Sequence, residues 1–264
     1  MTIRKLISAV IITALFPLVA FSQTDKKSIV KDTREYVDLG LPSKTLWATC
    51  NIGASKPEEF GLYFAWGETK GYTSDTSDGH QFNMKTYRFC RGTYDSLTKY
   101  CGVRGFGIVD NKKELEPGDD AATVNWGSKW EMPSSDQMTE LCDSANTIIE
   151  WTTLNGVNGR KITSRKNGNS IFFPAAGWRY DDRLWDDATN GQYKSRTLFE
   201  ESTSYSLLFD QESIYCFHSL REVGASVRPV RTQKQKSGKK KIDKNETEED
   251  VFMMVPVEVP LPKK

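Results

Sequence analysis

Short apolar runs separated by turn residues dominate two parts of the chain, and they predict short antiparallel strands. In the first part we expect strands at residues 36–41, 46–52 and 62–66, the last of them rich in aromatic side chains. Proline and serine at positions 42 and 43 separate the first two. These runs are too short for amphipathic helices and therefore favour a β arrangement.

The second part predicts two hairpins. Residues 160–165 and 170–174 flank Lys166-Asn167-Gly168-Asn169, a strong turn signal because Asn and Gly tolerate positive φ. Residues 204–209 and 213–217 flank a polar turn in the same way, and 225–230 is the last expected strand. Pairing of neighbouring strands in this manner is typical of an α+β domain rather than of alternating βαβ units.

One helix is predicted after Pro133. Ser134 and Gln137 have the spacing of a capping box. Apolar residues then recur on one helical face, at Met138, Leu141, Cys142 and Ala145. We therefore expect Cys142 to face the core.

Residues 67–120 show no periodicity and predict a long irregular segment, which is often functional when ordered. All seven tryptophans lie between Trp47 and Trp185, so the core is expected in that region and its flanks.

The N-terminus predicts a cleavable signal peptide over residues 1–22. Arg4 and Lys5 precede an apolar run, and Ala20 and Ser22 are the small residues expected before a cut at Gln23. The run is shorter than a membrane-spanning helix and contains a proline. No cysteine lies near the cut, so we expect a protein exported to the periplasm or cell surface that is not a lipoprotein.

At the other end, residues 232–264 combine a lysine run, an acidic run and a proline-spaced apolar stretch, and predict a disordered charged tail. The folded domain is therefore expected over residues 30–231. The formal net charge is +1, which argues against a nucleic-acid partner.

Five cysteines remain in a chain that is expected to meet an oxidising compartment. Cys90 and Cys101 flank a short polar loop and are the expected disulfide; one more bridge among Cys50, Cys142 and Cys216 would leave a free thiol. With no CxxC motif and only two histidines, His80 and His218, zinc is not expected.

A set of ordered motifs resembles the Fibrobacter succinogenes major paralogous domain, a family of exported proteins abundant in Bacteroidetes. The motifs are YVDLGLPS at 36–43, LWATCNIGA at 46–54, FAWGE at 64–68, LTKYC at 97–101, DDAA at 119–122, WEMPS at 130–134, GNSIFFPAAG at 168–177 and GASVRPV at 224–230. The resemblance implies an irregular C-type-lectin-like fold, related to that of formylglycine-generating enzymes, and a binding or surface role. One departure is Tyr193-Lys194-Ser195-Arg196, where the family usually has Tyr-Trp-Ser-Ser.

Two clusters of carboxylates are candidate sites. Glu116, Asp119 and Asp120 are candidate calcium ligands, since calcium prefers carboxylate and carbonyl oxygens. The alternative, which we favour, is that Asp119 and Asp120 cap the next segment. Trp178, Trp185, Asp186 and Asp187 are candidate ligand-binding residues, because exposed aromatic rings stack on sugars.

Catalysis is not expected. Cys216 alone does not provide the paired cysteines of formylglycine-generating enzymes, and neither His80 nor His218 lies in a triad motif. The sequence therefore predicts an exported binding module that contacts a glycan or an envelope protein, with calcium as the one cofactor considered. The alternative is a structural component of the envelope without a small ligand.

Overall fold

The computed structural model describes residues 34–232 of the chain. These residues contain four small sheets and two short α-helices, joined by irregular segments. The elements below all belong to the unit that begins at Glu35. The predicted signal peptide lies outside the described residues, as does the predicted tail apart from Thr232. The described part is mostly β, which agrees with the expected α+β class at that level.

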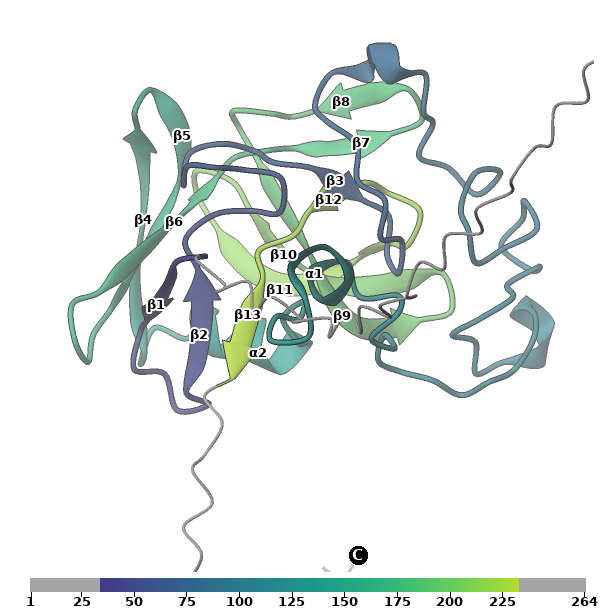
Figure 1. Cartoon of the computed structure of the whole chain (residues 1–264), viewed down its shortest axis with the longest axis horizontal. Helices are drawn as coiled ribbons and strands as arrows, with labels where there is room; N and C mark the ends of the chain where they lie inside the picture. Colours follow the sequence, from purple (N-terminus) through teal and green to yellow (C-terminus); the bar gives the residue numbers. More distant parts are fainter. Residues whose placement is uncertain (1–33, 233–264) are drawn as a thin grey trace, which may run out of the picture. The chain divides into compact units, whose positions relative to one another are not determined.

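A three-stranded antiparallel sheet joins the two ends of the described chain. β1 (Tyr36–Asp38) and β13 (Val230–Thr232) both pair with β2 (Thr45–Ala48) and lie on either side of it (Figure 1). The first two strands are shorter than predicted, because Gly40 adopts a φ of 62° and the amide of Lys44 closes a turn onto the carbonyl of Leu41.

The five-stranded sheet runs in the order β11-β10-β9-β12-β3. Its strands are β3 (Tyr63–Phe64), β9 (Gly191–Glu200), β10 (Thr203–Phe209), β11 (Ile214–Leu220) and β12 (Ala225–Ser226). The predicted hairpin at 204–217 is confirmed as β10–β11. The strand predicted at 225–230 is divided between two sheets, with β12 in this one and β13 in the first.

A third sheet contains β4 (Thr147–Leu154), β5 (Val157–Ser164) and β6 (Ser170–Pro174). The predicted Asn-Gly hairpin is confirmed as β5–β6, with Gly168 at a φ of 75°. Two further strands, β7 (Trp178–Tyr180) and β8 (Arg183–Trp185), form a hairpin of their own.

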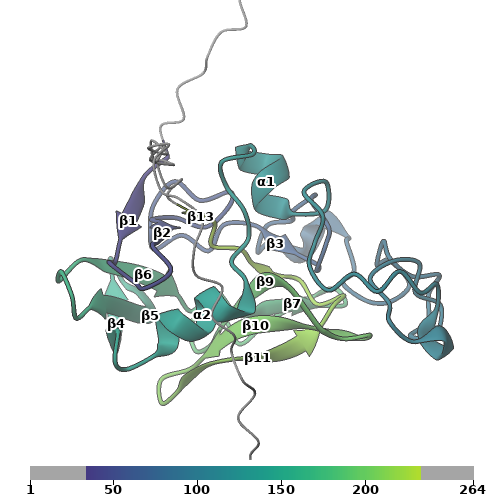
Figure 2. The ribbon, with the colours of Figure 1, turned by 90° about the horizontal axis from the view of Figure 1, so that it is seen from below.

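The predicted helix is α2 (Ser135–Cys142), and its capping box is confirmed: Ser134 Oγ accepts from the Gln137 amide, and Gln137 Oε1 accepts from the Ser134 amide. The helix ends before Ala145 because Asp143 is extended and its carboxylate accepts from the amide of Ala145. α2 packs against β9, β10 and β11 (Figure 2). A second helix, α1 (Ala121–Trp126), was not predicted.

Residues 67–120 are irregular, as expected, with only two 3-10 turns, η1 (Thr76–Asp78) and η2 (Arg104–Phe106). In Figures 1 and 2 much of this segment lies on the side of the domain opposite to β4, β5 and β6. Neither helix of the described residues is long and apolar enough to cross a membrane.

The core has two clusters of buried apolar side chains. One surrounds Trp66 and includes Tyr63, Phe64 and Trp130, and the other surrounds Trp47 and includes Phe173. Tryptophan therefore fills the core as expected at three positions, but Trp185 is 42% exposed.

Candidate functional site

Two of the three carboxylates predicted as calcium ligands, those of Glu116 and Asp119, form ion pairs with cationic side chains. The ammonium group of Lys99 contacts Glu116 and lies 2.5 Å from Asp119 Oδ2, which also accepts from the hydroxyl of Tyr100. Hydrogen bonds from Lys112 and Lys99 lower the pKa of Glu116 to about 2. Within residues 34–232 no three His, Cys, Asp or Glu side chains are grouped so that they could hold a metal ion. A lysine therefore takes the position that a cation would need between Glu116 and Asp119.

Asp120 caps α1, as the alternative interpretation held, whereas Asp119, which that interpretation also named as a cap, binds Lys99 and Tyr100. Its carboxylate accepts from the amide of Thr123 at 2.8 Å and from the amide of Met132 at 2.9 Å. Burial raises the pKa of Asp120. The role of this side chain is to join the helix to the segment that follows it.

The predicted Cys90–Cys101 disulfide is not formed. Both cysteines are free thiols, and they donate to different carbonyls, that of Met84 for Cys90 and that of Val103 for Cys101. Burial raises the pKa of the Cys90 thiol, which keeps it protonated. These two residues contribute packing and local hydrogen bonds rather than a cross-link.

The predicted tryptophans lie together on the β7–β8 hairpin. Trp178 and Trp185 are directly opposite each other, so their side chains share one face of it. Gly177 makes this approach feasible, because a Cβ there would lie 2.0 Å from the carbonyl oxygen of Trp185. Asp186 and Asp187 follow at the exposed end of β8.

A buried arginine fixes this hairpin to the rest of the domain. Side chains alternate along a strand, so Arg179 is buried while its neighbours Trp178 and Tyr180 lie partly exposed on the other face. The guanidinium donates to both carboxylate oxygens of Asp78, at 2.8 and 3.0 Å. The backbone of Arg179 also pairs with that of Gly224. The contacts of Arg179 therefore fix the hairpin that carries Trp178 and Tyr180 to the rest of the domain.

Beside the hairpin lies a pocket of about 520 Å³, which we call the Glu222 pocket. Its lining residues come from three distant parts of the chain: Gln81, Asn83, Met84, Lys85, Gly92, Tyr94, Tyr180, Asp181, Asp182 and Glu222. A backbone pair between Phe82 and Asp181 joins the loop to the hairpin. Asn83 Nδ2 also donates to Asp181 Oδ1 at 2.8 Å.

Glu222 is the one fully buried carboxylate in this lining, at 1% exposure. The hydroxyl of Tyr94 donates to its Oε1 at 2.6 Å, while its Oε2 has no hydrogen-bond partner. Burial, together with this hydrogen bond, raises the pKa of Tyr94. An unpaired buried acceptor costs free energy. Because this atom is closed to solvent, a donor in the pocket reaches it only when the side chain of Tyr94 moves aside.

Lys194 is a charged residue in the buried part of β9. It is completely buried and donates to Ser219 Oγ at 2.9 Å and to the carbonyl of Leu220 at 2.6 Å. Burial lowers the pKa of Lys194 to about 7, and the nearby Glu222 opposes that shift. This side chain therefore links β9 to β11 through polar contacts.

The two histidines pack against aromatic rings. His80 stacks on Tyr72 with ring centroids 3.6 Å apart, and His218 stacks on Phe199 at 4.5 Å. Neither imidazole is placed as a general base beside a nucleophilic side chain.

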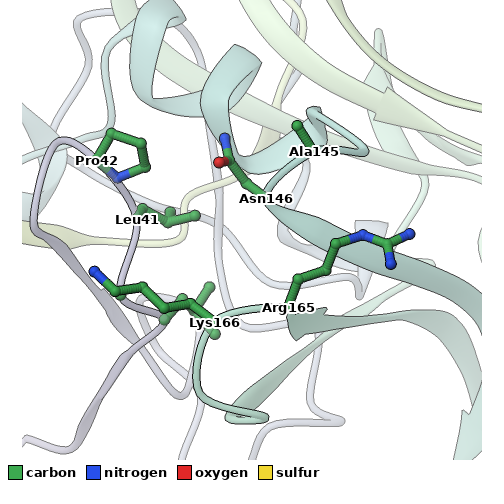
Figure 3. Close-up of a pocket in the computed structure, with 8 residues that line it drawn as sticks. Leu41, Pro42, Ala145, Asn146, Arg165 and Lys166 are labelled. Atoms are coloured by element: carbon green, nitrogen blue, oxygen red, sulfur yellow. The ribbon is translucent and has the colours of Figure 1, made fainter.

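A second pocket, of about 350 Å³, lies between the turn before β2, the end of α2 and the β5–β6 turn (Figure 3). Arg165 and Lys166 line it but extend in opposite directions in Figure 3. Arg165 Nε already donates to the carbonyl of Ser144. This pocket therefore lacks the convergent polar groups of the Glu222 pocket.

The sequence analysis identified Trp178 and Trp185 as candidates, but it predicted neither the β7–β8 hairpin nor the roles of Tyr94, Tyr180 and Glu222. Tyr180 had an available signal, since it alternates with Trp178 on the same strand. Tyr94 and Glu222 had none, because they are 128 residues apart and meet only in the folded chain.

Comparison of this chain with models of protein families, with curated proteins and with solved structures gives no significant match.

Proposed function

We propose that this protein is a non-catalytic binding module whose Glu222 pocket accepts a sugar residue of a glycan. The observation that carries the proposal is the convergence of two tyrosines with amide and carboxylate side chains on one cavity. Aromatic rings offer an apolar face to the C–H groups of a sugar. The amides of Gln81 and Asn83 both donate and accept, as sugar hydroxyls require.

The position of the pocket supports the same function. It is formed by the long irregular segment and by the hairpin that carries Trp178 and Trp185. Loops held by a rigid scaffold are where binding sites concentrate. Trp185 is exposed on that hairpin and supplies a second stacking surface for a neighbouring sugar unit.

Two expectations from the sequence also support the proposal: the export of the protein and the resemblance of its motifs to those of lectin-like domains. A mostly β domain with two helices and a long irregular segment is compatible with that fold. The motif resemblance and the predicted signal peptide support a site of action in the periplasm or on the cell surface, where glycans are abundant.

The structural alternative is favoured by one observation. β11 is an edge strand of its sheet and exposes Tyr215 and Phe217, at 47% and 50%. Such a surface suits a protein neighbour. A variant in this strand therefore serves as the control below.

Titration calorimetry of the full chain with oligosaccharides of glucose and glucosamine tests the proposal. We expect saturable binding that Tyr180→Ala weakens by about threefold to tenfold through loss of one stacking face. Tyr215→Ala, which removes a ring outside the pocket, leaves the affinity unchanged. Removal of calcium has no effect, because Lys99 already pairs with Glu116 and Asp119. No heat of binding with any sugar would refute the proposal.

A further inference from the structure

We propose that the sugar in the Glu222 pocket carries a free amino group, and that its ammonium form is attracted by Glu222. This inference rests on the proposed function and names the class of ligand more narrowly, as an amino sugar. It is carried by a geometric observation, the buried carboxylate with one oxygen that no donor reaches.

The charges in the lining favour a cation. Three carboxylates line the pocket, those of Asp181, Asp182 and Glu222, and they face one ammonium group, that of Lys85. Asp182 lies 3.8 Å from Arg183 across an exposed surface, where such pairing is weak. A cationic ligand would therefore enter a pocket whose own charges are mainly negative.

The cations nearest to Glu222 do not satisfy its free oxygen. Arg221 directs its guanidinium to the hydroxyl of Tyr87 and to the carbonyls of Lys99, Tyr100 and Glu201. The ammonium of Lys194 donates to Ser219 and Leu220. Within residues 34–232 Glu222 thus has a hydrogen bond from Tyr94 and no ion pair.

An ammonium group fits this place better than a metal ion does. The described carboxylates are not grouped as metal ligands require, whereas an ammonium needs only one or two acceptors and an aromatic face. Tyr94 and Tyr180 supply that face. Tyr94 is 41% exposed as a residue, so its side chain can shift when a ligand approaches Glu222.

Calorimetry below neutral pH with three tetrasaccharides tests the inference: β-1,4-linked glucosamine, its N-acetylated form and β-1,4-linked glucose. We expect the free amine to bind at least about tenfold more tightly than the two neutral sugars, the usual gain for a charged hydrogen bond. Glu222→Gln should abolish this preference and leave the affinity for the neutral sugars within about twofold. Glu212→Gln, an exposed carboxylate in the β10–β11 turn, is the matched control and should keep the preference.

The outcomes separate the two proposals. Equal binding of all three sugars overturns the amine assignment and leaves the binding module standing. Binding of tetralysine without binding of any sugar overturns both, because the partner is then a cationic peptide, and no binding at all has the same effect. If Glu222→Gln does not fold, a pH titration of the preference in the wild type replaces it, because Glu222 attracts only the ammonium form of the sugar. A preference that persists when the pH is raised until the amine is neutral would then contradict the assignment.

Discussion

Replacement of Arg228 by alanine is expected to lower the free energy of unfolding by at least about 3 kcal/mol, because it leaves several buried acceptors unpaired. The guanidinium is fully buried and donates to Asn51 and to the carbonyls of Ala48, Thr49 and Phe172. It also lies 4.5 Å from the ring centroid of Phe173. Arg228 therefore joins β2, β6 and the segment before β13.

Thermal unfolding followed by circular dichroism measures this effect. For a domain of this size, a loss of 3 kcal/mol corresponds to a fall in Tm of roughly 6–12 °C. Arg183→Ala is the control, since that side chain is 72% exposed and its removal should change stability by less than about 0.5 kcal/mol. Equal melting of the two variants would show that Arg228 does not hold these strands together.

Asp78→Ala is expected to cost about 3 kcal/mol, because it leaves the guanidinium of Arg179 buried without a counter-ion. The side chain of Arg179 is completely inaccessible, while that of Asp78 is 28% exposed. Loss of the pair loosens the β7–β8 hairpin, so this variant should also bind sugar more weakly than the wild type. Asp182→Asn, an exposed substitution on the same hairpin, should not change the stability.

The same pair predicts acid sensitivity. Hydrogen bonds from Arg179 lower the pKa of Asp78 from its ordinary value of 3.8 to about 2. Because the folded value is below the unfolded one, the pair stabilises the fold above pH 3.8 and loses this contribution as the pH falls toward 2. Chemical denaturation across this window should show a smaller pH dependence for Asp78→Ala than for the wild type.

Local signals in the sequence predicted part of this fold well. The capping box of Ser134 and Gln137 and the Asn-Gly turn at 167–168 act over a few residues, so the pattern alone identifies α2 and the β5–β6 hairpin. β9 escaped prediction because Lys194 and Ser195 are buried polar residues. They break the apolar alternation by which a strand is recognised.

Local sequence likewise predicted some residues of the candidate site and missed others. Trp178 and Trp185 were predicted to act together, and their pairing on one hairpin follows from a short range of sequence. The role of Glu116 and Asp119 could not be predicted, because it depends on Lys99, which the fold brings between them. Glu222 is likewise defined by its surroundings rather than by a motif.

The most direct test of the account is a ¹H–¹⁵N correlation titration of the full chain with the glucosamine tetrasaccharide. We predict that the amide shifts concentrate at Gln81–Lys85, Gly92–Tyr94, Tyr180–Asp182 and Glu222, the residues of the Glu222 pocket. Shifts concentrated instead around Leu41, Asn146 and Arg165, the pocket of Figure 3, or an unchanged spectrum at saturating sugar, would contradict it.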